Sequence, residues 1–480
     1  MLGKVLLSSF ISISLASSVV HAKESIEDDL SGFDSEVVVK KSSGSDADLA
    51  GFDDEVQTAP NTKKETTKVK EQNRVTISGD LAFKASVGYK EHKVDGIEYS
   101  GINQAQSSLS LELDAKLSDN WKLKVSGDAF YDAIYDIHST NNYSDDILDA
   151  YKTQLRLDDT YVQGKITSAL DAKIGRQIVV WGKSDSIRIT DVINPLDNRT
   201  PAMTDIEDLR LSVGMFKFDY YYGVWNFSAM IIPENRIMIE APARSEYFPV
   251  DAIFPIAPNP FLELETPNTS WDNMQYAFGA NGVFSGWDLS FYAADVLDQK
   301  WHIDPDTMTR KVTKIQMLGS AINIASGSWL LKSEVALLDG VKYNSTRDAK
   351  SRLDALIGFD YMGIKDTVLS VEVANRHIFD YEAQMSKVVP RPDYVDEDEV
   401  QTALRATRSF YNDSLNATAL LSIFGSSWQN GGFARVWIEY EVANAIGLNA
   451  GIVEYIDGDK PLMKAIRDND RIFADITYSF

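Results

Sequence analysis

A period of two, which dominates the chain from Val75 to its end, constrains the fold more than any other feature. Segments such as 75–87 and 108–116 alternate apolar with polar side chains over about 10 residues. Strands of a soluble sandwich are usually shorter, whereas a membrane-spanning β-strand needs about 9–11 residues with one apolar and one polar face. No apolar stretch of helix length follows residue 22. Because lipid cannot satisfy open backbone groups, the pattern predicts an all-β, antiparallel transmembrane barrel.

The alternation predicts about 18 strands, with about 16 as the alternative. The expected strands lie at 74–90, 104–117, 121–137, 152–165, 170–182, 209–222, 225–233, 274–284, 287–297, 312–325, 329–338, 351–362, 366–377, 399–410, 415–424, 432–443, 446–456 and 470–480. Short turns and long polar loops largely alternate between them. This is typical of outer-membrane barrels, which have short periplasmic turns and long extracellular loops. An even number of strands places both ends of the barrel in the periplasm.

Aromatic residues support the same orientation. Four tryptophans each stand just after a short turn, in phase with the apolar face, which predicts a girdle at the inner interface: Trp121, Trp225, Trp287 and Trp329. The last strand ends in Phe480, as do the carboxy-terminal strands that bacterial outer-membrane barrels present to their assembly machinery. The predicted location is therefore the cell outer membrane.

Residues 1–22 have the pattern of a secretory signal peptide. They contain Lys4, an apolar run from 5 to about 20, and the small residue Ala22 at the expected cleavage point. A membrane anchor helix is the alternative, but serines interrupt the run, and an anchor needs about 20 apolar residues. The chain contains no cysteine, which excludes a lipidated cysteine, a disulfide framework and a thiolate metal site.

Residues 23–72 are rich in Asp, Glu, Ser, Lys and Thr and cannot bury enough apolar surface to offset chain entropy. We expect a disordered, acidic periplasmic tail that precedes a barrel at 73–480. An LxGFDxEV motif occurs twice in this tail, and a flexible tether with two such motifs could dock a partner. The docking candidates are Leu30, Phe33, Val37, Leu49, Phe52 and Val56. A solvated linker with a chance repeat is the alternative.

The densest run of charged and special residues lies at 173–199. The candidates for a pore constriction are Arg176, Gln177, Trp181, Lys183, Asp185, Arg188, Asp191, Asn194, Asp197 and Arg199. Two interpretations are open: a surface loop satisfied by its own ion pairs, and a constriction folded into the pore. Arg176 falls on the apolar side of its strand, where a charge is costly. We therefore expect a β-bulge at 175–177, or a local twist, that turns its guanidinium into the lumen.

Polar positions of the later strands are expected to line the lumen. These candidates are Lys332, Glu334, Arg352, Asp354, Glu372, Arg376, Arg435 and Glu439. Numbering across the intervening turn places Asp354 roughly opposite Arg376. Ion pairs that only fill the lumen are one interpretation, and a selectivity ring for a charged solute is the other. Ile357 should face lipid, so Ile357→Arg should impair assembly more than the lumen-facing Leu356→Arg.

Two further features bear on function. The connection at 231–265 is unusually apolar for an extracellular loop, so it either packs as a small lid core or lines an apolar entry. Catalysis is not expected, because the histidines of the mature chain map to strand ends or loops and no metal-ligand spacing occurs: His92, His138, His302 and His377. We expect no enzyme, no cofactor and no metal site.

The charge of the chain bears on its partners. A formal net charge of −24 argues against a nucleic-acid partner. Acidic loops at an outer surface would instead meet divalent cations and lipopolysaccharide.

The chain also resembles a known family. The resemblance rests on the stretches GRQIVVWGKSD and RITDVINPLDNR, the acidic GFDDE motif, the hairpin SGWDLSFYAA, and the ending DNDRIF with a final YSF. These stretches resemble an uncharacterised family of Gram-negative outer-membrane β-barrels, a domain of unknown function, over nearly the whole chain. Members of that family are often encoded beside exporters of the resistance-nodulation-division class with MMPL-type domains. The resemblance therefore implies a periplasmic or inner-membrane transport partner, with hydrophobic or lipidic cargo.

These observations lead to one leading hypothesis and two alternatives. The leading hypothesis is an outer-membrane channel or transport component that recruits an export partner through its tail. A general diffusion porin is the first alternative, and a structural or adhesive barrel without transport is the second.

Overall fold

The computed structural model describes residues 74–480. The predictions for the signal peptide at 1–22, and for the tail at 23–72 with its docking residues, lie outside the described residues.

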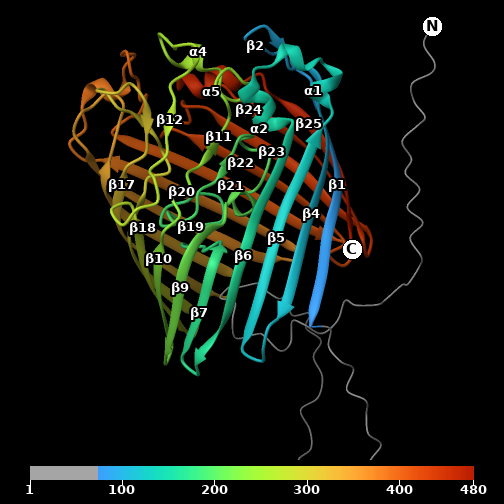
Figure 1. Cartoon of the computed structure of the whole chain (residues 1–480), viewed down its shortest axis with the longest axis vertical. Coiled ribbons are helices and arrows are strands. Elements are labelled where there is room, and N and C mark those ends of the chain that lie inside the picture. The colour runs from blue at the N-terminus through green and yellow to red at the C-terminus, as the bar shows by residue number, and fades with distance from the viewer. Residues whose placement is uncertain (1–73) are drawn as a thin grey trace, which may run out of the picture. The chain divides into compact units, whose positions relative to one another are not determined.

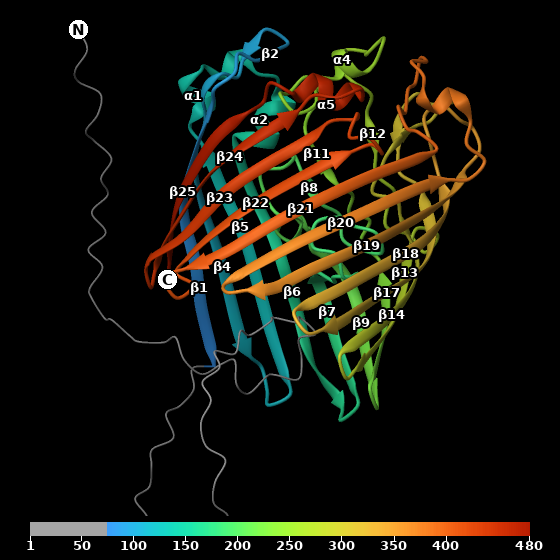
Figure 2. The ribbon, with the colours of Figure 1, turned by 180° about the vertical axis from the view of Figure 1, so that it is seen from behind.

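Antiparallel strands close into one 18-stranded barrel, as predicted (Figures 1 and 2). The strands of the barrel are β1 (Val75–Gly88), β4 (Gly101–Lys116), β5 (Trp121–Asp132), β6 (Thr153–Thr167), β7 (Leu170–Gln177), β9 (Val213–Tyr222), β10 (Trp225–Ile232), β13 (Gln275–Phe284), β14 (Trp287–Leu297), β17 (Lys314–Ser326), β18 (Trp329–Val341), β19 (Lys350–Ile364), β20 (Thr367–Ile378), β21 (Asp398–Phe410), β22 (Leu415–Phe424), β23 (Gly432–Ala443), β24 (Ile446–Ile456) and β25 (Arg471–Ser479). Each pairs with the next barrel strand along the chain. β1 also pairs with β25, from Asp80 opposite Ser479 to Gly88 opposite Arg471, which closes the barrel.

The connections alternate in length, also as predicted. Turns of two to four residues join the strands at one end, as at 223–224 and 285–286. The long connections carry the short helices and small sheets, several of which gather at the top of Figure 1. They are α1 (Ile134–Ile137), α2 (Asp145–Tyr151), α3 (Ile206–Leu209), α4 (Val250–Ile253), α5 (Pro461–Ile466), the 3₁₀ helices η1 (Thr140–Asn142) and η2 (Ala383–Ser386), and the short strands β2 (Lys93–Val94), β3 (Ile97–Glu98), β8 (Asp197–Asn198), β11 (Ile239–Glu240), β12 (Leu264–Glu265), β15 (His302–Ile303) and β16 (Arg310–Lys311).

The two faces of the wall differ as the period of two requires. Ile357 is 54% exposed on the outer face, whereas Leu356 is 1% exposed. At the short-turn end, Trp287 stacks on Phe284 with ring centroids 4.1 Å apart, and Trp329 lies 4.5 Å from Tyr361. A closed barrel with an apolar outer face and an aromatic girdle is built for the outer membrane. Among the described helices, none is long and apolar enough to cross a membrane.

Two strands, β5 and β7, end five residues earlier than predicted, and a side chain explains each ending. β5 stops at Asp132, short of the expected 137, because the Asp132 carboxylate accepts the amide of Ile134 at 3.0 Å and starts a turn. β7 stops at Gln177, short of the expected 182. Beyond it, Asn194 accepts the amide of Val179 at 2.8 Å, a donor that a neighbouring strand would otherwise have used.

The apolar loop at 231–265 packs as a small core at the long-loop end, the first of its two interpretations. Its buried residues Val250, Ile253 and Phe254 pack with Ile303 of the neighbouring loop. The Tyr394 hydroxyl donates to the carbonyl of Ile253 at 2.9 Å, so a third loop is tied to this core.

Candidate constriction site in the barrel lumen

The connection between β7 and β9, residues 178–212, lies inside the barrel, and we call it the lumen segment. Its apolar side chains are buried: Val179, Trp181, Ile187, Ile189 and Ile193. They share one core with inward-facing residues of the wall, among them Ala277, Met317, Leu338, Leu356, Ala374 and Ala403. The core therefore holds the segment against the inner face of the strands from β13 to β21. It also makes this part of the lumen apolar, where sequence reasoning expected a charged wall.

Two carboxylates of the wall hold the backbone of this segment, and we call the pair the carboxylate clasp. Glu334 of β18 is 3% exposed and accepts the amides of Lys183 at 2.5 Å and Ser184 at 2.7 Å. Its second oxygen accepts the amide and the hydroxyl of Thr190, at 3.2 Å and 2.8 Å. Successive backbone amides that converge on one carboxylate form a favourable nest.

Glu372 of β20 forms the other half of the clasp and is 1% exposed. It accepts the next two amides of the segment, from Asp185 at 2.9 Å and from Ser186 at 3.0 Å. The hydroxyl of Ser184 also donates to it, at 2.7 Å. Consecutive amides of one short turn are therefore divided between carboxylates of two different strands.

Glycines make the close approach feasible. Gly182 has a φ of +91°, and a Cβ there would lie 2.7 Å from an oxygen of Glu334. Gly358 of β19 stands between Lys332 and Glu372 in the strand register. A Cβ on Gly358 would lie 3.2 Å from the Glu372 side chain. Gly182 therefore needs both the left-handed backbone and the space that glycine allows, whereas a side chain at Gly358 would require Glu372 to shift by a few tenths of an ångström.

Ion pairs tie the lumen segment to several other strands. Lys183 lies 2.6 Å from Asp288 of β14, and Asp185 pairs with Lys332 of β18. Asp197 lies 3.0 Å from Arg156 of β6. A charge buried without a partner would be penalised by several kcal/mol, and these pairs avoid that penalty.

Contacts within the segment fix its shape. Asp191 is buried and lies 3.0 Å from Arg188 and 2.9 Å from Arg210. Asn194 bridges the two ends, because its amide group donates to the carbonyls of Gln177 at 3.2 Å and Leu211 at 2.8 Å.

Aromatic contacts and Arg199 complete the packing. Trp181 stacks on Tyr292 of β14 with centroids 4.6 Å apart. Arg199 pairs with Asp197, lies over the ring of Phe130 at 5.8 Å, and donates to Gln154 at 2.6 Å.

The other wall candidates face the lumen but are not all joined to the segment. Asp354 is opposite Arg376, as the numbering predicted, but its closer partner is Arg352 at 2.7 Å. Arg376 reaches the segment through the carbonyl of Arg188 at 3.3 Å. Glu439 is exposed.

Arg176 is the exception among the constriction candidates, because the predicted bulge is wrong. The register of β7 with β6 and with β9 is regular through 174–177. Arg176 is paired with Gly214, whose neighbours Val213 and Met215 are buried in the lumen core, so Arg176 faces outward. Its Nε donates to Glu234 at 3.1 Å, and that carboxylate balances the charge without a twist.

Comparison with known proteins then decides the family. The family model described as "Protein of unknown function (DUF1302)" matches residues 5–480. The chain belongs to this family. No curated protein matches it significantly.

Solved structures resemble the DUF1302 barrel at low sequence identity. Pseudomonas aeruginosa OccD3 (OpdP) is 9% identical, with 85% of this chain and 91% of that chain covered and a TM-score of 0.49. P. aeruginosa OccK11 (OpdR) is 10% identical, with 85% and 96% covered and a TM-score of 0.48. Acinetobacter baumannii OccAB1 is 10% identical, with 85% and 95% covered and a TM-score of 0.48. We draw no functional argument from likenesses at this level.

Sequence reasoning missed several partners in this DUF1302 barrel. Asp205 lies 2.9 Å from Arg405 and 3.0 Å from Arg435, and so ties the far end of the lumen segment to β21 and β23. Asp205 directly precedes α3, and an aspartate at that position predicts the start of a helix but not these ion pairs with arginines 200 and 230 positions away. Arg156 and Asp288 had no such signal, because their partners lie 41 and 105 positions away in the chain.

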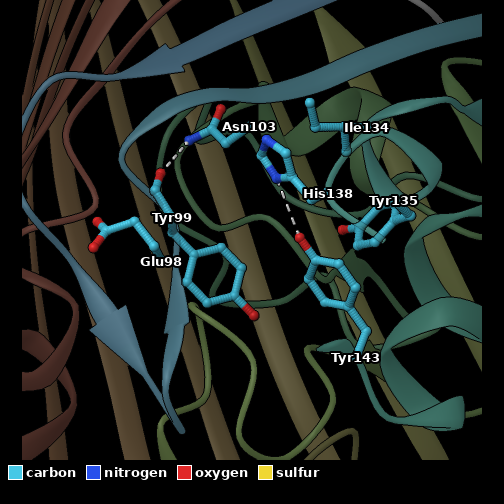
Figure 3. Close-up of a pocket in the computed structure, with 7 residues that line it drawn as sticks. All are labelled: Glu98, Tyr99, Asn103, Ile134, Tyr135, His138 and Tyr143. Atoms are coloured by element: carbon cyan, nitrogen blue, oxygen red, sulfur yellow. Dashed lines mark hydrogen bonds between the residues drawn. The ribbon is translucent and has the colours of Figure 1, made fainter. Parts of the chain in front are cut away.

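A small pocket lies at the long-loop rim (Figure 3). Tyr99, His138 and Tyr143 face one another there, and the His138 ring lies 3.3 Å from the Tyr143 hydroxyl. Burial raises the pKa of Tyr99 well above its usual value, so the phenol stays neutral. The enclosed space of about 10 Å³ is room for about one water molecule. Within residues 74–480, no group of three or more His, Asp or Glu residues is placed to hold a metal ion.

Proposed function

We propose that this DUF1302 protein is a transport component of the outer membrane, and that the lumen segment is its resident constriction. The carboxylate clasp is the observation that carries the proposal. A barrel of about 18 strands is wide enough for water unless something fills it. Here a folded segment of the same chain occupies the lumen, held by hydrogen bonds to side chains rather than by a strand ladder.

The division of the lumen supports transport over a purely structural role. One side of the wall carries the apolar core that receives the lumen segment. The other side carries exposed charges on alternate, inward positions, among them Lys84 of β1 and Glu439 of β23. A barrel that only anchors or adheres needs neither a hydrated charged wall nor a segment fitted to the opposite wall.

The proposal differs from a general diffusion porin in the state of the resting lumen. If the protein were a general porin, the intact chain would conduct ions freely. A constricted transporter would conduct ions weakly until the lumen segment moves. The test is single-channel conductance of the full chain and of a variant that lacks residues 185–207. We expect the deletion to raise conductance sharply. Equal conductance of the two proteins would contradict the proposal, and high conductance of the intact chain would favour the porin.

The second part of the proposal concerns the protein that this barrel binds. We propose that the repeated motif around Phe33 and Phe52 recruits a periplasmic or inner-membrane exporter, as the family resemblance implies, for hydrophobic or lipidic cargo. Two copies of one motif in the same chain raise the effective concentration of a partner without a larger interface. Cross-linking from the periplasm in cells, with and without the tail, tests this part separately from conductance.

A further inference from the structure

The upper half of β6 has a strand neighbour on one side only. β6 pairs with β5 from Thr153 to Gly164, but it pairs with β7 only from Thr160 to Thr167. Figure 1 shows β6 extending well beyond the upper end of β7. Within residues 74–480, no backbone pairing joins residues 153–159 to any element but β5. We call 153–159 the unpaired edge of the wall.

Side chains take the place of the missing ladder at this edge. Arg176, at the end of β7, donates from Nη1 to the carbonyl of Leu157 at 3.4 Å and from Nε to Glu234 at 3.1 Å. Glu234 in turn accepts the amide of Gly214, at the start of β9, at 2.6 Å. Ser212 also donates to Asp159 at 2.5 Å, and Arg199 donates to Gln154 at 2.6 Å. The wall is therefore closed here by side-chain contacts rather than by backbone pairing, and on the outer face the contact is the one from Arg176.

The two sides of the unpaired edge differ in chemistry. Leu155 faces outward and is 89% exposed, compared with 54% for Ile357 in the intact wall. Leu157 and Val180 add further exposed apolar surface. Directly behind the edge, on the lumen side, Arg156 pairs with Asp197 of the lumen segment at 3.0 Å.

The lumen segment is anchored at this same place. It leaves the wall after Gln177 and rejoins it at Val213, and these two residues are paired with each other. Asp197 and Asn198 of the segment also pair with β11, which follows the loop that contains Glu234. A movement of the segment away from Arg156 would therefore uncover the unpaired edge from inside.

We propose that the unpaired edge is a lateral gate through which an amphiphile with an apolar chain passes between the lumen and the outer membrane. The apolar chain meets Leu155 and Leu157 on the membrane side, and the polar head meets the charges of Arg156 and Asp197 behind them. Arg176 and Glu234 form the latch. The inference deepens the proposed transport function and rests on it for the cargo, but the gate itself is testable without transport.

The absence of native cysteine allows a direct test in the full chain reconstituted in phospholipid vesicles. Asn198→Cys places a thiol next to Asp197, the partner of Arg156 behind the gate, and Arg176→Met removes the latch but keeps an apolar stem. A maleimide attached to a phospholipid headgroup reports access from the membrane, and a charged, water-soluble maleimide reports access from the lumen. We expect Arg176→Met to raise the lipid-probe rate about tenfold, because the charge-assisted hydrogen bond from Arg176 to the Leu157 carbonyl, which crosses the edge, is lost.

Lys124→Met is the matched control. It removes the Lys124 to Glu112 pair at 2.9 Å, which joins β4 and β5 where the backbone ladder is continuous, and should leave both rates unchanged. An unchanged lipid-probe rate in Arg176→Met, or an equal rise for the water-soluble reagent, would overturn the gate. A third outcome would also overturn the gate. If Leu155→Cys reacts more slowly with the lipid probe as the protein density in the vesicles increases, a second copy of the chain covers the edge. None of these readouts depends on conductance, so the gate and the constriction can fail separately.

Discussion

Replacing the clasp carboxylates by amides should release the lumen segment while the barrel stays intact. In Glu334→Gln, one oxygen that accepts hydrogen bonds becomes an amino group that can only donate. In the more favourable orientation the remaining oxygen keeps the amides of Lys183 and Ser184, and the amino group faces Thr190. The Thr190 hydroxyl can rotate to accept, but its backbone amide is left unpaired.

The number of unpaired amides sets the expected change in docking of the lumen segment. One buried, unpaired amide costs about 1–3 kcal/mol, and about 2 kcal/mol corresponds to a change of about 30-fold in the fraction of undocked segment. Glu372→Gln leaves the backbone amide of either Asp185 or Ser186 unpaired in the same way. Because both carboxylates grip one turn, the double variant should show coupling rather than simple addition.

Hydrogen exchange at the amides of residues 183–186 measures undocking, and single-channel conductance measures its consequence. Glu439→Gln is the matched control, because it removes one lumen charge that accepts no hydrogen bond from the segment within the described residues. We expect faster exchange and more frequent openings for each clasp variant and neither change for the control. Exchange at the wild-type rate in Glu334→Gln would refute the clasp, whatever the conductance shows.

Two further predictions concern the membrane face and the tail. Ile438→Arg places a charge on the lipid-facing side of β23 and should cost about 2–4 kcal/mol, whereas Asn449→Arg, opposite Glu439 in the lumen, should assemble normally. Urea unfolding of the refolded barrels measures both, and equal stabilities would contradict the register. Replacing Phe33 and Phe52 together by alanine should lower periplasmic cross-linking more than either single change and leave the barrel folded; unchanged cross-linking would reduce the motif to a linker.

The barrel itself could be predicted closely from the sequence, for a physical reason. The membrane demands an apolar side chain at every second position of each strand, so the period of two is imposed locally and is visible in one strand at a time. The early ends of β5 and β7 could not be predicted from this alternation. Each depends on one polar side chain, Asp132 or Asn194, that accepts a hydrogen bond from a backbone amide.

The lumen could be predicted only in part. The alternation of the strands correctly placed Glu334 and Glu372 on the inner face. Their partners are backbone amides, and because every residue except proline has one, the sequence does not indicate which amides they bind. The same alternation suggested that arginine at Leu356 would be milder than arginine at Ile357. Alternation alone could not show that Leu356 is buried against the lumen segment, where a charge would lie in an apolar core.

For Arg176, the outward orientation that alternation predicts is correct, but the predicted β-bulge is wrong. Strict alternation placed it on the outer face, and the cost of a charge there suggested a bulge at 175–177. The wall does contain a bulge, but on β6, where the pairing shifts between Thr160 and Leu157. The charge is balanced instead by Glu234, 58 positions away, which no local pattern could connect to it.

The apolar wall beneath the lumen segment has a consequence for cargo. If the segment moves away, inward-facing Met317, Leu338 and Leu356 lose the side chains that cover them. Burying a side chain of this size is worth about 1.5–3 kcal/mol, so an open lumen filled only with water would lose several kcal/mol at this wall. A cargo with an apolar chain would cover the same residues, and its polar head would face the charged wall at Glu439. The segment and an amphiphile would then compete for one surface, and binding of the cargo would itself offset the cost of opening.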